Sequence, residues 1–86
     1  MTSKQLLATK IANGVTLMRR VHGWPQIELA RVAGIAVPYI SRLENGKNLP
    51  TIETIERLAK AFELTPRLFL EVCGLGYFTG VTNEQN

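Results

Sequence analysis

Polar and small side chains recur at the spacing of one helix face in the middle of the chain. Pro38, Ser41, Arg42 and Asn45 stand at i, i+3, i+4 and i+7, which places them on one side of a helix. The guanidinium fork of Arg42 matches the O6 and N7 acceptors of guanine, and the Ser41 hydroxyl can donate or accept. Val37 and Pro38 offer only apolar contact, to a thymine methyl group or, without any readout, to the helix start. This face suits base recognition in the major groove of DNA.

Two short helices must position this face. Apolar residues repeat at helical spacing on both of them: Ile27, Leu29, Ala30 and Ala33 on the first, and Ile40 and Leu43 on the second. Gly34 lies between them, where a helix-ending residue with positive φ is expected. Because the break is only a few residues long, the helices must cross steeply. Residues 26–46 are therefore predicted to form a helix-turn-helix. Its helices start at Pro25 and Ala36, which carry no capping hydroxyl, so tertiary packing must hold them.

The same reasoning predicts three further helices and an all-α, compact five-helix domain. The expected buried stripes are Leu7, Ile11, Gly14/Val15, Met18 and Val21 in the first helix, and Ile52, Ile55, Leu58, Ala59 and Phe62 in the fourth. Gly14 inside a helix indicates close packing of another backbone. The fifth helix runs from about Pro66 to Cys73 and ends at Gly74. We assign residues 1–74 to the helix-turn-helix domain and residues 75–86 to a short non-helical tail.

Positive charge is concentrated in the half that holds the helix pair. Residues 1–50 contain seven bases and two acids, whereas residues 51–86 contain three bases and five acids. The net charge is therefore +5 in the first part and −2 in the second, within an overall +3. This asymmetry favours a polyanionic partner for the basic half, although a basic face without a partner would look the same.

These features together resemble the lambda-repressor-like (Cro/C1, or XRE) family of bacterial and phage regulators. The resemblance covers about Ile11 to Leu70, roughly two thirds of the chain. The matching residues are Arg19, Gly23, Gln26, Leu29, Ala30, Gly34, Ile40, Ser41, Leu43, Glu44, Gly46, Pro50, Leu58, Ala59 and the ending LTPRLFL. The resemblance implies sequence-specific binding of double-stranded DNA for transcriptional control, with about Val37–Asn45 in the major groove.

The resemblance also assigns roles to residues around the recognition helix. It implies a salt bridge between Arg19 and Glu44 that ties this helix to the body; the alternative is two solvated surface charges. It favours Gln26, with the free N–H groups of its helix start, as a clamp for one phosphate oxygen. The alternative is a generic polar residue at a helix start.

Four further side chains are expected near the DNA backbone. Asn45, Lys47 and Asn48 follow the recognition helix and would meet phosphates by charge and backbone amides. Tyr39 either gives its hydroxyl to a phosphate or packs on the loop before the fourth helix.

Composition argues against other function classes. A single cysteine excludes a disulfide framework, and a single histidine with no cysteine near it argues against a metal site. We expect no cofactor. No paired carboxylates, nucleophile–base set or phosphate-cradling glycine loop appears, so we do not expect an enzyme. No apolar run is long enough to span a membrane, and the start lacks a secretory layout, so we expect a cytoplasmic protein.

Excess apolar residues near the C-terminus predict a homodimer on a near-palindromic operator. We expect the interface to hold Leu68, Phe69, Val72, Leu75, Tyr77 and Phe78. The alternative is a tail that folds back on its own domain. Two other readings of the whole chain stay open: an antitoxin that binds a toxin partner as well as DNA, and the DNA-binding fragment of a longer regulator.

Overall fold

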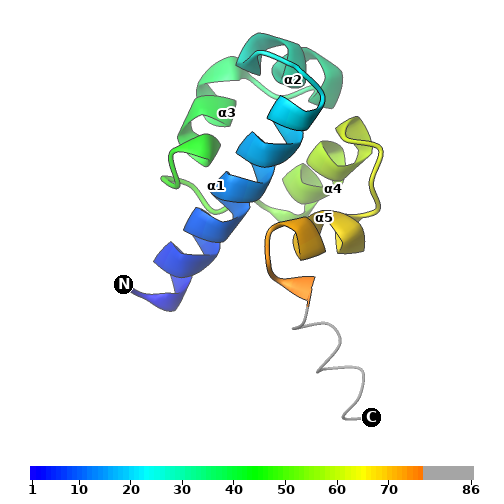
Figure 1. Ribbon diagram of the computed structural model, residues 1–86. Coiled ribbons are helices and arrows are strands. Elements are labelled where there is room, and N and C mark those ends of the chain that lie inside the picture. The colour runs from blue at the N-terminus through cyan, green and yellow to red at the C-terminus, as the bar shows by residue number, and fades with distance from the viewer. Residues whose placement is uncertain (77–86) are drawn as a thin grey trace.

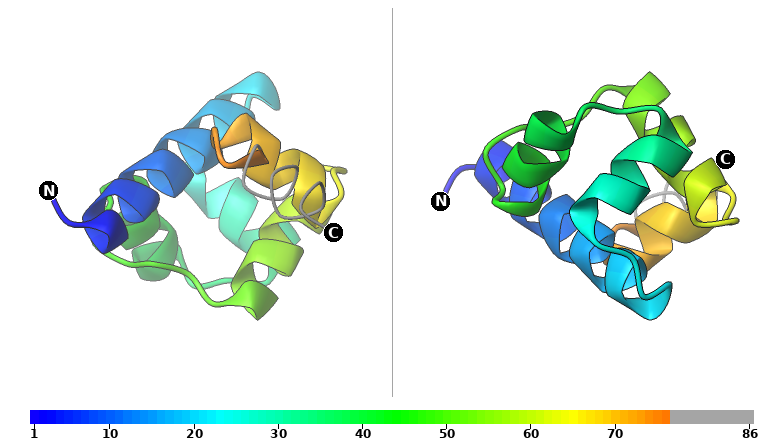
Figure 2. Two further views of the ribbon diagram at one scale, coloured as in Figure 1. Left: turned by 90° about the horizontal axis from the view of Figure 1, so that it is seen from below. Right: turned by 90° about the horizontal axis from the view of Figure 1, so that it is seen from above.

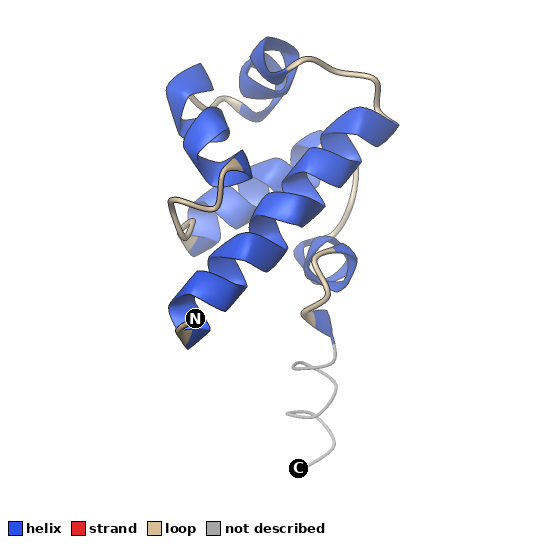
Figure 3. Cartoon of the chain, turned by 60° about the vertical axis from the view of Figure 1, so that its left-hand side comes forward, coloured by secondary structure: helices blue, strands red, loops and turns tan. Residues whose placement is uncertain are grey.

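The computed structural model describes residues 1–76 and contains only helices and loops in that range (Figures 1 and 3). The helices are α1 (Ser3–Val21), α2 (Gln26–Ala33), α3 (Val37–Glu44), α4 (Ile52–Ala61) and α5 (Pro66–Val72). The predicted five-helix, all-α fold is confirmed. The predicted non-helical tail lies, from residue 77 onward, outside the described residues.

The helix starts differ in how they are capped. α1, α4 and α5 each begin after a threonine whose hydroxyl accepts a backbone N–H of the first turn. Pro25 and Ala36 precede α2 and α3, and neither makes a side-chain capping bond. Gly34 ends α2 in the left-handed region with φ 70°, as its position predicts. Local propensity is therefore weakest in the helix pair, and packing against the rest of the domain must fix its geometry.

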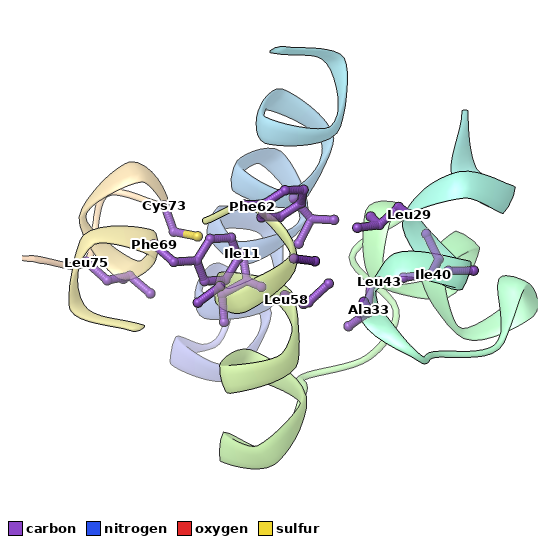
Figure 4. Packing of buried hydrophobic residues seen from close by; sticks show 14 residues of the cluster. Ile11, Leu29, Ala33, Ile40, Leu43, Leu58, Phe62, Phe69, Cys73 and Leu75 are labelled. Atoms are coloured by element: carbon purple, nitrogen blue, oxygen red, sulfur yellow. The ribbon is translucent and has the colours of Figure 1, made fainter. Parts of the chain in front are cut away.

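The long helix α1 forms one edge of the molecule, and the other four helices lie along one flank of it (Figures 1 and 2). α1 packs against α3 and α5, while α2 packs against α3 and α4. The largest fully buried side chains are Val15, Leu29, Ile40, Leu43, Leu58, Phe62 and Phe69, so every helix contributes to one core (Figure 4). Ile40 and Leu43 fasten α3 to this core and leave its opposite face outward.

Three residues of the predicted buried stripes are exposed instead. Val21 and Ile27 are each 67% exposed, and Ile52 is 76% exposed. Each stands in the first or last turn of its helix. Ile27 is also two positions from the buried Leu29, about 200° away around α2, so it lies off the buried face. Apolar character alone therefore does not show which terminal residues of a helix are covered.

α5 approaches α1 at Gly14, which explains this glycine inside a helix. A Cβ atom added at Gly14 would lie 2.3 Å from Cys73 Sγ and 3.2 Å from Cys73 Cα. The predicted close approach of another backbone is thus confirmed. Cys73 is buried in this contact, and burial raises the pKa of its thiol to about 11. The thiol therefore stays protonated at neutral pH and acts as a small apolar group.

The predicted dimer interface needs correction at two positions. Phe69 is fully buried and Leu75 is 7% exposed, and both belong to the core of a single chain. Phe69 and Ile11 of α1 both belong to this buried cluster (Figure 4). Leu68 and Val72 do face outward, at 47% and 37% exposure. Sequence composition predicts too many apolar residues for one face of α5, but α1 and α4 cover part of that excess within the monomer.

Tyr77 and Phe78 of the same prediction lie outside the described residues. The burial of Leu75 also shows that the core reaches one residue beyond the domain boundary expected at residue 74.

Candidate nucleic-acid interface

The outward face of α3 carries the side chains that the sequence predicts as base readers. Val37, Pro38 and Arg42 are exposed and Ser41 is half-buried, while Ile40 and Leu43 between them are fully buried. The residues therefore project from one helix away from the core. Such a face presents a hydroxyl, a guanidinium and two apolar groups to any molecule that contacts α3 from outside.

Arg19 and Glu44 lie in direct contact and join α1 to the end of α3. Arg19 Nε donates to Glu44 Oε2 at 2.6 Å and Nη2 donates to Oε1 at 3.0 Å, a two-bond geometry. Arg19 Nη1 also donates to the Trp24 carbonyl at 2.8 Å. The two side chains are only 14% and 7% exposed. The pair is therefore largely withdrawn from water and fixes the C-terminal end of α3 against α1.

Gln26 joins the same cluster, which differs from the prediction for its side chain. Its Nε2 donates to Glu44 Oε1 at 3.1 Å, so the amide is engaged inside the protein. A carboxylate has about four lone-pair sites, and Arg19 occupies two of them. A buried glutamate that is paired with one arginine therefore has room for a second hydrogen-bond donor. The predicted Arg19–Glu44 pair could have indicated such a donor, and Gln26 supplies it. Glu44 consequently links α1, α2 and α3.

The electrostatics of the cluster favour its charged form. Burial raises the pKa of Glu44, but hydrogen bonds from Arg19 and Gln26 together with the Arg19 charge more than offset burial, so the pKa lies below its usual range. The hydrogen bond to Glu44 likewise raises the pKa of Arg19 above its ordinary value. Both groups are charged at neutral pH, and the cluster acts as a structural ion pair.

The residues predicted to meet phosphates gather at the end of α3, with one exception. Asn45 and Lys47 are exposed, and Lys47 has no ion-pair partner among residues 1–76. The Asn45 amide donates to the Ser41 carbonyl at 2.9 Å. Gln26 lies at this same end, since its Nε2 donates to Glu44, the last residue of α3. The exception is Tyr39, which stands in the first turn of α3.

Tyr39 and Asn48 both contact Arg42. The Tyr39 ring packs partly against the core, and Arg42 Cζ lies 5.6 Å from its centroid. The Asn48 amide, in the orientation that satisfies both neighbours, accepts from Arg42 Nε at 3.2 Å and donates to the Lys47 carbonyl at 2.9 Å. Neither contact with Arg42 was expected from the sequence.

Comparison with known proteins places the helix pair in a family. Residues 18–69 match the HTH_3 model, described as helix-turn-helix, and this match spans more than half of the chain. The chain belongs to this family. This match confirms the predicted XRE-type helix-turn-helix family and its general role in DNA binding and transcription regulation.

Two relatives each align with more than two thirds of the chain. The chain is 37% identical over 60 residues to the antitoxin HipB of Escherichia coli K12, across 70% of this chain and 68% of HipB. It is 34% identical over 62 residues to the HTH-type transcriptional regulator DdrOP3 of Deinococcus deserti, across 72% of this chain and 48% of that protein. The match therefore spans about half of DdrOP3.

The fold agrees with a solved family structure. The restriction-modification controller protein C.AhdI from Aeromonas hydrophila superposes with a TM-score of 0.69 and 26% identity, over 72% of this chain and 94% of C.AhdI. No helix among residues 1–76 is long and apolar enough to cross a membrane. The described part of the chain also contains no group of three or more His, Cys, Asp or Glu residues that would hold a metal ion.

Proposed function

We propose that this helix-turn-helix protein regulates transcription as a homodimer that binds a near-palindromic operator with α3 in the major groove. The observation that carries this proposal is the exposed face of α3, which is held rigidly from behind by Ile40, Leu43 and the Glu44 cluster. Arg42 and Ser41 supply polar base contacts, and Val37 and Pro38 supply apolar ones. An ordered face on a rigid helix is what direct readout of base edges requires.

Contacts with the DNA backbone would come mainly from residues around the C-terminal end of α3. Asn45, Lys47 and Asn48 follow α3, where phosphates pass a helix seated in the groove; Lys47 would meet them by its charge and Asn48 by its backbone N–H group. Tyr39, in the first turn of α3, would offer its hydroxyl to a phosphate there. Because the Gln26 amide is engaged by Glu44, the clamp at the start of α2 would use the backbone N–H groups of Gln26 and Ile27. The charge of +5 on residues 1–50 supports the same assignment.

Arg42→Ala is expected to weaken operator binding by about 1–3 kcal/mol and to relax the preference at one base pair, because it removes the two-bond contact to guanine. Lys47→Ala should weaken binding to all DNA sequences equally. It should also lower the slope of log affinity against log salt concentration by about one unit, because one phosphate contact is lost. Selection from a randomised DNA pool, followed by titration at several salt concentrations, measures both effects. Unchanged base preferences in Arg42→Ala would remove Arg42 as a base reader.

The dimer would form through the outward face of α5. Leu68 and Val72 are one helical turn apart and both exposed, which leaves an apolar strip on the surface of a small domain. A two-fold contact across this strip, with the residues that follow Leu75 contributing, would bury it. The symmetry would then set two copies of α3 about one DNA turn, roughly 34 Å, apart.

Leu68→Lys is expected to shift the protein toward monomer at micromolar concentration, because it places two like charges across the two-fold contact. Sedimentation velocity measures the change, and Ile52→Lys is the matched control: Ile52 is also exposed, at 76%, but it starts α4. A wild-type protein that is already monomeric, or equal effects of the two variants, would exclude the α5 interface.

A second candidate function rests on one similarity. HipB, which is named as an antitoxin, shares 37% identity with this chain over 60 residues. The chain would then bind a toxin protein in addition to DNA. Tagged full-length chain, expressed together with the neighbouring genes, would retain a stoichiometric protein partner if this function holds, and would elute alone if it does not.

A further inference from the structure

Arg42 is the one base reader of α3 with a long, flexible side chain, and the structure holds it at two points. Asn48 Oδ1 accepts from Arg42 Nε at 3.2 Å, and the Tyr39 ring lies 5.6 Å from Cζ. Arg42 makes no ion pair with a carboxylate among residues 1–76. Its position is therefore set by a neutral acceptor and an aromatic face, which leave its positive charge available to DNA.

The Asn48 amide is itself fixed, so it can act as a support. Its Nδ2 donates to the Lys47 carbonyl at 2.9 Å, which decides which amide atom faces Arg42. The Lys47 N–H in turn donates to the Arg42 carbonyl at 3.0 Å. These bonds close a small ring from the Arg42 backbone through the loop and back to the Arg42 side chain. The oxygen of Asn48 is thus held at a set distance from the helix that carries the guanidinium.

The use of Nε limits how the guanidinium can meet a base. A guanine presents O6 and N7, and an arginine fork can bind them with either Nε and one Nη or with both Nη atoms. With Nε bound to Asn48, the outer pair Nη1 and Nη2 is the one that remains for the base. Arg42 Cζ lies over the Tyr39 ring, and neither Nη atom makes a hydrogen bond within residues 1–76, so both stay available to a base.

We propose that Asn48 and Tyr39 are positioning residues that hold Arg42 for end-on recognition of guanine, and thereby set its base specificity. The proposal rests on the proposed function, in which Arg42 reads a base. An unsupported arginine loses rotamer freedom when it binds a base, and this cost falls only on the complex with the preferred base. Support before binding reduces that cost, so it raises the discrimination between guanine and other bases at one position.

Asn48→Ala in the full-length chain should lower the discrimination at the Arg42-dependent base pair by about three- to tenfold. Preferences at other positions and the salt slope should not change. Asn48→Asp keeps an acceptor for Arg42 Nε but loses the donor to the Lys47 carbonyl. It should therefore retain more of the discrimination than Asn48→Ala, while its charge weakens binding to all DNA sequences. In an Arg42→Ala background, Asn48→Ala should cause no further loss of discrimination. Competition titrations with the selected operator and its single-base variants measure each value.

Two controls separate support of Arg42 from other roles. Asn45→Ala removes a second amide at the end of α3, one bound to Ser41 rather than to Arg42, and should change affinity without changing discrimination. Tyr39→Phe keeps the ring and should retain discrimination. If Asn48→Ala and Asn48→Asp both lost the same affinity for every DNA sequence, the Asn48 side chain would contact a phosphate, and the proposal would be overturned. If Arg42→Ala itself alters no base preference, the base-reading function fails and the proposal fails with it; if only Asn48→Ala is silent, the positioning role alone fails.

Discussion

Glu44→Ala is expected to lower the free energy of unfolding by about 3–5 kcal/mol, because it leaves a buried guanidinium without its partner. Arg19 is 14% exposed, and its Nε and Nη2 both bind the carboxylate that would be removed. The change also frees the Gln26 amide. A destabilisation of this size should reduce the melting temperature of so small a domain by more than about 10 °C.

Thermal unfolding of Glu44→Ala, Arg19→Ala and the double variant measures the coupling. The double variant should be little worse than either single one, because each alone already breaks the pair. Glu28→Ala is the control, since Glu28 pairs with Arg31 on the surface and should change the melting temperature little. Small, additive losses at Arg19 and Glu44 would show that the two charges act independently.

The same pair makes stability depend on pH in a defined direction. The pKa of Glu44 is lower in the folded chain than in the unfolded one, because the Arg19 and Gln26 hydrogen bonds outweigh burial. Its contribution is therefore present above the unfolded pKa, about 4.3, and is lost as the pH falls through the folded value. The difference in stability between the wild type and Glu44→Gln should accordingly narrow in acid.

The sequence predicts the helices well, because their signals are local. Threonine caps, helix-ending glycines and apolar stripes all act within one or two turns, and the observed helices follow them. The contacts that the sequence does not reveal are long-range. The Gln26–Glu44 bond joins residues 18 positions apart in the chain, on different helices. Asn48 reaches back to Arg42 only because the loop after α3 turns sharply, with Gly46 at φ 71°.

α5 shows a different limit of sequence analysis. It is seven residues long, and four of them are apolar, so periodicity cannot tell which side meets the core. Leu68 and Phe69 are adjacent and point about 100° apart, so the sequence shows that one of them can be buried without showing which one. The three-dimensional structure separates the two, with Phe69 inward at 0% exposure and Leu68 outward at 47%. Adjacent substitutions should therefore have unlike effects.

Phe69→Ala is expected to destabilise the domain by about 3–5 kcal/mol, as large-to-small changes of a buried phenylalanine do. The Phe69 ring lies 5.8 Å from the Phe62 ring, centroid to centroid, so its removal opens a cavity where α4 and α5 meet. The change should also weaken the packing of α5 against the core, and α5 carries the exposed Leu68 and Val72 of the proposed dimer contact. Urea unfolding, monitored by circular dichroism, gives the free energy.

The concentration dependence of that loss distinguishes a core residue from an interface residue. Because Phe69 is buried within one chain, the destabilisation should be the same at low and high protein concentration. Leu68→Ala should leave the monomer nearly as stable as the wild type and should instead weaken any stabilisation that grows with concentration. If Phe69→Ala unfolded like the wild type at low concentration and differed from it only at high concentration, Phe69 would act between chains and its place in the core would be wrong.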